Sequence, residues 1–271
     1  MHRQYLHTGD RTIAYLDTAP AEASLPVLVL LHAFPLSAAM FEPQLKQPPA
    51  GWRVLAPDLA GFGGSSDIEE TDRGAEIDDY ARDVVTLLTE LGVPGAVVGG
   101  VSMGGYVTFA VLRRAPELVR GVVLVDTRAT ADSPEGRANR RSMLAQVDRE
   151  GVGAVGRDMM PKLLGATTRE AGALEPTVRR IIIQQSPEAV RGAIRRMMDR
   201  PDSSRELGTL AVPLLIVVGA EDTLTPVSDA EAMAAQAPGA ELAVIPAAGH
   251  LSSLEQPQAF GERLSAFLSR L

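Results

Sequence analysis

The sequence predicts an α/β fold, in which a mostly parallel sheet carries helices on both faces. Short runs of apolar, β-branched residues recur along the chain, and longer helical stretches alternate with them. Several of the short runs are apolar at every position, which is typical of a parallel sheet buried between helices. Alternation of this kind indicates right-handed crossovers between parallel strands.

Six of the short runs are expected to be strands of this sheet. They lie at residues 27–31, 53–56, 96–98, 121–125, 213–218 and 241–245. Residues 5–7 and 12–16 lie on either side of Gly9-Asp10 and predict an antiparallel hairpin at the edge of the sheet. Helices are expected at about 76–91, 103–114, 227–236 and 258–271.

Residues 128–210 interrupt the alternation, because they contain no strand pattern and several amphipathic stretches rich in Arg and Met. Ser133 and Ser186 are each followed by Pro, which is typical of an N-cap and the first residue of a helix. We therefore expect an all-helical cap at 128–210, inserted into a core that comprises 1–127 and 211–271.

Composition limits the possible functions. The 271 residues include no cysteine, which excludes disulfides, thiolate catalysis and cysteine-ligated metals. The formal net charge of −8 argues against nucleic acid or an anionic membrane as partner. The N-terminal residues lack a secretory signal, and the longest apolar runs are too short to cross a bilayer. We expect a cytoplasmic monomer or homodimer that acts on a small molecule.

A nucleophile is predicted at Ser102. Gly100-Val101-Ser102-Met103-Gly104 matches the G-x-S-x-G pattern and lies directly between a predicted strand and a predicted helix. So tight a turn is expected to strain the backbone of the serine and to expose its hydroxyl at the carboxyl edge of the sheet. The two glycines let strand and helix pass almost in contact. The alternative is an ordinary turn with a capping serine, which this setting disfavours.

The base is assigned to His250 by elimination, because a serine hydroxyl needs a neighbouring base and histidine is the usual one. The chain has four histidines. His2 and His7 lie in the predicted hairpin, and His32 precedes the nucleophile in the chain. Only His250 follows the last strand, which fits the order serine, acid, histidine that accompanies this motif.

A carboxylate must orient the histidine and stabilise the imidazolium that forms. Asp222 follows the strand at 213–218 and is assigned this role, whereas the neighbouring Glu221 is expected to point elsewhere. Asp126, which closes the strand at 121–125, is the rival candidate. Its alternative role is a helix cap or an ion-pair partner at the start of the insertion.

The negative charge that develops on the reacting carbonyl oxygen needs preorganised donors. One candidate is the backbone N–H of Met103, which begins the helix after the nucleophile. The other is the N–H of Phe34 in the loop His32-Ala33-Phe34-Pro35, since proline has no N–H to offer.

These motifs together resemble the capped α/β-hydrolase superfamily, in its serine esterase-like subgroup. They are His-Ala-Phe-Pro (32–35), Asp-Leu-Ala-Gly-Phe-Gly-Gly-Ser-Ser (58–66), Gly-Val-Ser-Met-Gly-Gly (100–105), Gly-Ala-Glu-Asp-Thr-Leu-Thr-Pro (219–226) and Gly-His (249–250). They follow this order over nearly the whole chain. The resemblance implies an eight-stranded, mostly parallel sheet, a helical lid and a Ser-Asp-His triad.

The chain departs from the superfamily at Ala33, where glycine is usual, and at Ala60, where Arg or Lys is common. If the backbone at position 33 needs a positive φ, Ala33 is strained. The segment Gly61-Phe62-Gly63-Gly64 matches no phosphate-binding fingerprint and is expected to be a structural turn.

Serine rather than aspartate as nucleophile favours acyl transfer within this superfamily. We expect a carboxylesterase, without metal or organic cofactor, that cleaves esters of small to medium apolar acyl groups. Phe34 and the adaptable side chains Met143, Met160 and Leu163 are expected to line the substrate site. The arginines of the insertion, Arg196 among them, are expected to form a solvated helix face rather than to bind a carboxylate. The alternatives are a C–C bond hydrolase or an enol-lactonase-like enzyme with the same triad, and a ligand receptor of this fold.

Overall fold

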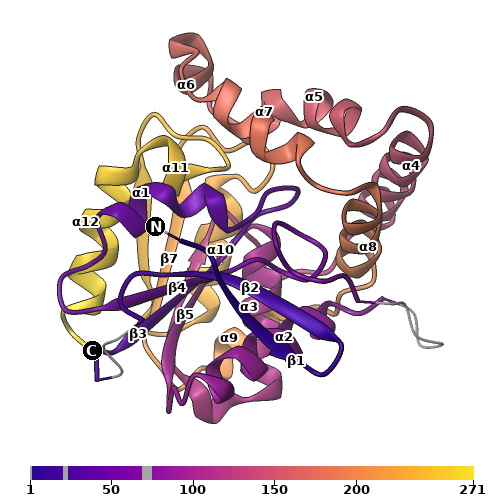
Figure 1. Ribbon diagram of the computed structural model, residues 1–271. Helices are drawn as coiled ribbons and strands as arrows, with labels where there is room; N and C mark the ends of the chain where they lie inside the picture. Colours follow the sequence, from indigo (N-terminus) through magenta and orange to yellow (C-terminus); the bar gives the residue numbers. More distant parts are fainter. Residues whose placement is uncertain (1, 21–23, 69–74) are drawn as a thin grey trace.

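The computed structural model describes residues 2–20, 24–68 and 75–271 (Figure 1). Within these residues, eight strands form one sheet in the order β1-β2-β4-β3-β5-β6-β7-β8. Their bounds are β1 (Gln4–Thr8), β2 (Arg11–Asp17), β3 (Val27–Leu31), β4 (Arg53–Pro57), β5 (Ala96–Val101), β6 (Val119–Val125), β7 (Leu214–Gly219) and β8 (Glu241–Ile245). β1 pairs with β2 and β2 with β4 in antiparallel fashion, and all other neighbours are parallel. The predicted fold class and edge hairpin are confirmed.

The register of the parallel strands aligns their carboxyl ends at one edge of the sheet. Leu31 of β3 lies beside Gly100 of β5, and Val101 of β5 lies beside Val125 of β6. At the other side, Gly219 of β7 lies beside Ile245 of β8. Every residue of β3, β4, β5 and β7 is buried, as expected for strands that are almost entirely apolar; the charged exception, Arg53 of β4, is paired with Asp17. The loops that follow these strands therefore meet above a rigid, fully packed platform.

Helices cover both faces of the sheet. Figure 1 shows α1, α11 and α12 on one side and α2 and α3 on the other. The core helices are α1 (Glu42–Lys46), α2 (Ile77–Glu90), α3 (Met103–Arg114), α10 (Val227–Gln236), α11 (Ser252–Glu255) and α12 (Pro257–Leu268), with the 3₁₀ helices η1 (Ala38–Phe41) and η2 (Pro116–Leu118). The four long helices agree with the predicted ranges to within a few residues. The short α1 and α11 were not predicted, because a single turn gives too little periodicity to detect.

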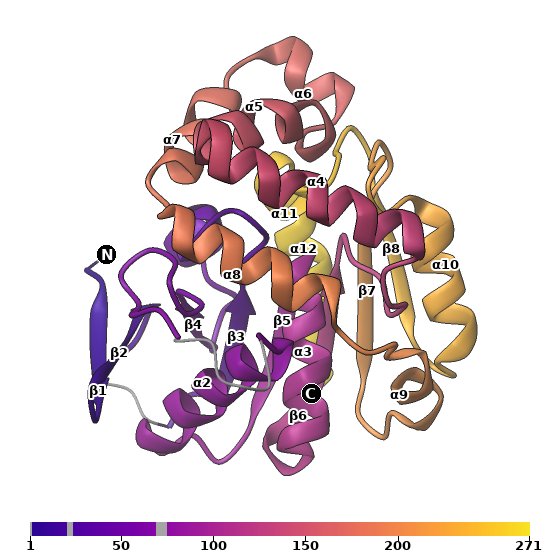
Figure 2. The ribbon, with the colours of Figure 1, turned by 90° about the vertical axis from the view of Figure 1, so that its right-hand side faces the viewer.

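Six helices occupy the segment between β6 and β7. They are α4 (Pro134–Glu150), α5 (Val152–Leu163), α6 (Ala166–Ala171), α7 (Glu175–Ile183), α8 (Pro187–Met198) and α9 (Ser204–Thr209). The hydroxyls of Ser133 and Ser186 accept hydrogen bonds from the N–H groups of Gly136 and Ala189, so both predicted N-caps are present. Figure 2 shows α4–α8 above the sheet, whereas α9 lies apart from them and packs beside α10. We refer to α4–α8 as the cap helices.

A buried charged pair joins the cap helices to the core. Arg196 of α8 is only 1% exposed, and its guanidinium lies 3.2 Å from a carboxylate oxygen of Asp79 and 5.1 Å from the ring centre of Tyr80, both on α2. Arg200, just after α8, stacks over Tyr106 of α3 at 3.9 Å. The expectation of a solvated arginine face is therefore wrong for Arg196, which lies on the buried face of α8 with Ala189 and Ala193 and has its partners in a distant part of the chain.

Among the described residues, no helix combines the length and the apolar character needed to span a membrane.

Candidate active site

Ser102 lies at the sharp turn between β5 and α3 and has the strained backbone that the motif predicts. Its φ is 53° and its ψ is −112°, a conformation that costs a non-glycine residue about 1–3 kcal/mol. A Cβ on Gly100 would lie 2.1 Å from the carbonyl carbon of Gly104, and a Cβ on Gly104 would lie 2.1 Å from the carbonyl oxygen of Leu31. Only glycine fits at either position. The hydroxyl of Thr127, after β6, donates to the carbonyl oxygen of Ser102 over 2.8 Å and braces the turn.

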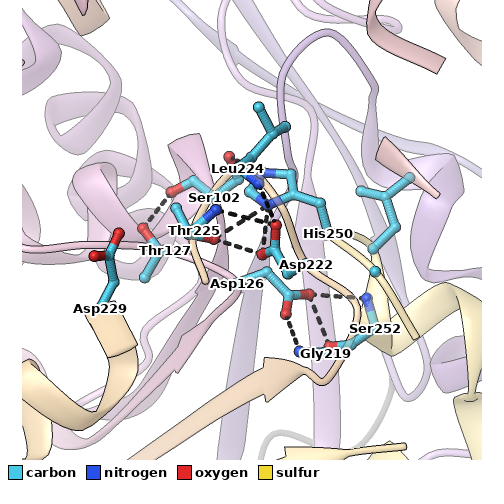
Figure 3. Close-up of polar contacts among 12 residues, drawn as sticks. Ser102, Asp126, Thr127, Gly219, Asp222, Leu224, Thr225, Asp229, His250 and Ser252 are labelled. Carbon is cyan, nitrogen blue, oxygen red and sulfur yellow. Dashed lines mark hydrogen bonds and ion pairs between the residues drawn. The ribbon is translucent and has the colours of Figure 1, made fainter. Parts of the chain in front are cut away.

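His250 lies in the loop after β8 and faces Ser102 (Figure 3). Its Nε2 is 2.7 Å from Oγ of Ser102, and its Nδ1 is 2.8 Å from Oδ2 of Asp222. The imidazole is 3% exposed, while Ser102 is partly accessible. Three side chains that are far apart in the sequence thus form one continuous hydrogen-bonded chain at the carboxyl edge of the sheet.

The carboxylate of Asp222 is held by the loop that carries it. Oδ1 accepts hydrogen bonds from the N–H groups of Leu224 at 2.8 Å and Thr225 at 3.0 Å, and Oδ2 accepts from the Thr225 hydroxyl at 2.6 Å. Burial raises the pKa of Asp222, but the charge of His250 and these hydrogen bonds outweigh burial and hold the pKa below its ordinary value. An ionised carboxylate only accepts, so Nδ1 of His250 carries the proton and Nε2 is left to accept from Ser102.

The pKa of His250 is raised above its usual value. Burial lowers this pKa, but the charge of Asp222, the hydrogen bond from Nδ1 to Asp222 and the charge of Asp126 together more than offset burial. The imidazole is thereby a stronger base than a histidine in water, which suits it to take a proton from a serine hydroxyl.

Asp126 closes β6 but does not contact His250 in the described structure. It is fully buried with a φ of 47°, and its Oδ1 accepts from the N–H of Gly219 at 2.9 Å. Its Oδ2 accepts from the N–H and the hydroxyl of Ser252 at 2.8 and 2.7 Å. Burial, aided by the nearby charge of Asp222, raises the pKa of Asp126 to about 7. Asp126 therefore connects the end of β7 to the start of α11, whereas Asp222 is the carboxylate that contacts the imidazole of His250.

Two backbone N–H groups were predicted to stabilise an oxyanion. Met103 is the first residue of α3, where N–H groups have no partner within the helix. Phe34 lies in the loop after β3, 3% exposed, ahead of a cis peptide bond to Pro35. Ala33 is not among the described residues with positive φ, so the expected strain there is absent.

His32 has a structural role next to this loop. It is fully buried, and its Nε2 accepts a hydrogen bond from the N–H of Leu59 at 3.0 Å. Burial lowers the pKa of His32, so the ring is neutral. The nearby segment 61–64 is a structural turn, as expected: Gly61 and Gly63 have positive φ, and the N–H of Gly64 donates to Asp58.

The residues expected to line the substrate site belong to the apolar core or pack against it. Phe34, Met160 and Leu163 are buried members of the core, and Met143 is partly buried against the core. Among the described residues, no group of three or more His, Asp or Glu side chains is arranged to hold a metal ion.

The sequence did not reveal the residues that support the triad. Thr127 and Thr225 brace Ser102 and Asp222, and Glu255 accepts from the N–H groups of Gly249 and Leu251 on either side of His250. A threonine three residues after an acid is a common enough event that its sequence position carries no signal.

Comparison with known proteins supports the architecture. A family model described as the alpha/beta hydrolase family matches residues 28–263. The chain is 27% identical over 258 residues to 3-oxoadipate enol-lactonase 2 of Acinetobacter baylyi, covering 92% of this chain and 91% of that protein. It is 29% identical over 244 residues to the pimeloyl-[acyl-carrier protein] methyl ester esterase of Aromatoleum aromaticum, covering 86% and 94%. Among solved structures, a thermophilic esterase from Thermogutta terrifontis superposes with a TM-score of 0.91 at 35% identity, covering 100% of this chain and 99% of that one.

Proposed function

This chain belongs to the alpha/beta hydrolase family, and from that premise we propose that it is a carboxylesterase that works through Ser102, His250 and Asp222. The assignment as a hydrolase rests on membership of the family. The proposal that Ser102, His250 and Asp222 carry out the reaction rests on one observation: His250 lies within hydrogen-bond distance of both Ser102 and Asp222, at 2.7 and 2.8 Å. This is the arrangement that a nucleophile, a base and an orienting acid require.

The proposed reaction begins when Oγ of Ser102 attacks the ester carbonyl and gives its proton to Nε2 of His250. The imidazolium that forms is stabilised by Asp222, and the N–H groups of Met103 and Phe34 stabilise the oxyanion. The tetrahedral intermediate collapses, and the alcohol leaves with the proton from His250. Water then attacks the acyl-enzyme, gives a proton to His250, and the carboxylic acid is released as Ser102 regains its hydrogen.

We propose esters of small to medium apolar acyl groups as substrates. Phe34, Met143, Met160 and Leu163 would contact the acyl group. All four are apolar, Phe34 lies in the loop after β3, the other three lie on α4 and α5, and methionine adapts to irregular apolar shapes. In this proposal the segment 128–210 acts as the cap, with α4–α8 as the part that covers the site. The similarity to an esterase of known structure at 35% identity supports an ester substrate.

Ser102→Ala tests the proposal. Removing the nucleophile of such a triad lowers kcat by about 10⁶-fold while the protein remains folded. The measurement is hydrolysis of aryl and alkyl esters of increasing acyl length, with thermal unfolding of the variant as control. Ester hydrolysis at the wild-type rate by Ser102→Ala would refute the assignment.

A lactonase is the second candidate, since the chain resembles an enol-lactonase over nine tenths of its length. A lactone passes through the same acyl-enzyme, but the alcohol stays attached to the acyl group. Measuring kcat/KM for lactones beside open-chain esters of equal carbon number separates the two. A C–C bond hydrolase would instead favour a β-diketone, and a ligand receptor would turn over none of these substrates at a useful rate.

A further inference from the structure

One segment of the cap helices rests directly on the loop that carries His250. We call residues 164–167, which join α5 to α6 and include the first two residues of α6, the cap linker. A Cβ on Gly249 would lie 2.3 Å from the backbone nitrogen of Gly165, and a Cβ on Gly165 would lie 2.8 Å from the backbone nitrogen of Gly249. The two backbones therefore touch with no side chain between them, one residue before the proposed base.

A single carboxylate connects this contact to both sides of His250. Oε1 of Glu255, at the end of α11, accepts from the N–H groups of Gly249 at 2.8 Å and Leu251 at 3.1 Å. Its Oε2 accepts from the N–H of Gly165 at 2.8 Å. Hydrogen bonds to a charged acceptor are about twice as strong as neutral ones. Glu255 thus holds the N–H groups of the residues before and after His250 and connects them to the cap linker.

A second carboxylate ties the same linker to the loop of the proposed acid. Glu221, adjacent to Asp222, accepts from the N–H of Thr167 at 2.9 Å and from its hydroxyl at 2.5 Å. The hydrogen bonds from Thr167 hold the pKa of Glu221 below its usual value, so the acceptor is ionised at neutral pH. The cap linker consequently contacts the loops of both proposed triad members that lie downstream of the cap.

We propose that Glu255 is a positioning residue that makes the alignment of His250 with Ser102 depend on the docking of the cap linker. The inference rests on the proposed function of the triad. When the linker is docked, Gly165 and the His250 loop share one carboxylate and the imidazole is fixed. When the cap helices move away, Glu255 loses its cap contact and the His250 loop loses the backbone that packs against Gly249. A displacement of about 1 Å is enough to cost roughly 100-fold in rate.

Glu255→Gln is the first variant. It keeps the shape of the side chain but replaces one acceptor oxygen by an amide that can only donate, so that a donor faces either Gly165 or the His250 loop. We expect kcat for a short-chain ester to fall about 10- to 100-fold with KM changed by less than about threefold. The matched control is Glu262→Gln, an exposed glutamate on the adjacent helix α12, which we expect to leave both parameters unchanged. An unchanged kcat in Glu255→Gln overturns the proposal.

Gly165→Ala disturbs the same contact from the cap side, because the added methyl meets Gly249 and Glu221. We expect a similar loss of kcat, and the double variant Glu255→Gln/Gly165→Ala is expected to be no slower than the slower single variant, since both break one coupling. Effects that multiply in the double variant, or a Gly165→Ala enzyme with wild-type kcat, would show that the cap linker does not act on His250 through Glu255.

Hydrogen exchange provides a readout that needs no substrate. Both variants should speed exchange of the amides of Gly249 and Leu251 without a comparable change at β5 or β7. A wild-type protein that hydrolyses no ester or lactone would contradict the proposed function, whereas unchanged exchange at these two amides would contradict the role of Glu255. The two failures are therefore distinguishable.

Discussion

Two of the regions in which this molecule buries charged side chains are the carboxyl edge of the sheet and the joint between α2 and α8. At the edge, Asp222 and Asp126 each accept three or more hydrogen bonds from backbone N–H groups, from hydroxyls and, for Asp222 alone, from His250. At the joint, Arg196 pairs with Asp79 and stacks over Tyr80.

The two regions differ in what their charges control. At the edge, the pKa of His250 is raised above its usual value and that of Asp126 is raised to about 7, whereas the pKa of Asp222 is lowered; perturbed pKa values of this kind are typical of functional sites. At the joint, Arg196 instead holds α8 onto α2 through Asp79 and Tyr80. We therefore expect substitutions at the edge to change kcat for ester hydrolysis, and substitutions at the joint to change the free energy of unfolding.

Among substitutions of these buried charges, Asp222→Asn should give the largest effect. An amide at this position favours the wrong tautomer of His250, and kcat is expected to fall by about 10⁴-fold with little change in Tm. The measurement is ester hydrolysis by the purified variant beside Asp126→Asn. A larger loss in Asp126→Asn than in Asp222→Asn would exchange the roles of the two carboxylates.

Arg196→Met should act on stability instead. It leaves the Asp79 carboxylate without its buried partner, although the more exposed Arg82 still contacts Asp79. We expect the free energy of unfolding to fall by about 3 kcal/mol, measured in urea, with kcat per folded molecule within about threefold of wild type. Lys46→Ala, which removes the exposed pair with Glu42, is the control and should change stability by less than about 0.5 kcal/mol. Equal losses in the two variants would mean that the joint contributes no more than a surface pair.

The pH dependence of the wild-type enzyme tests the electrostatics of the edge. Because Asp222 and Asp126 hold the pKa of His250 above its ordinary value of about 6.5, the base becomes protonated already above that pH as the solution is acidified. kcat/KM is expected to fall tenfold per pH unit below the pKa of His250. A profile that stays flat down to pH 5 would exclude His250 as the base.

Asp126→Asn should have the smallest effect of these predictions, which is a shift in the pH at which kcat/KM begins to fall, the acid limb of the profile. The charge of Asp126 raises the pKa of His250, so its removal shifts the limb to lower pH. Since burial raises the pKa of Asp126 itself to about 7, its carboxylate is only partly ionised on the limb, and we expect a shift of less than about one unit. Asp10→Asn, in the exposed turn between β1 and β2, should leave the profile in place. A shift to higher pH would contradict the assigned sign.

Local signals in the sequence were sufficient for most of the fold. The bounds of β3, β8, α3 and α10 agree with prediction to the residue, because uninterrupted apolar runs and clear periodicity mark them. The G-x-S-x-G pattern was equally local in the sequence. In the structure, Gly100 is required by contacts with Gly104 within the turn, whereas Gly104 is required by the carbonyl oxygen of Leu31 in β3. His250 could be selected because so few histidines compete for the role.

The sequence by itself thus determined the sheet, the turn at Ser102 and the candidates for base and acid. Only the tertiary structure showed that His250 contacts Asp222 and not Asp126. Both aspartates follow buried strands, and only the path of the loop after each strand distinguishes them. The tertiary structure also showed that Arg196 is buried against Asp79, and that Gly165 and Gly249 lie in contact and both donate to Glu255. Arg196 and Asp79 are 117 positions apart in the sequence, and Gly165 and Gly249 are 84 positions apart. Local propensities cannot predict which distant residues come into contact once the core has packed.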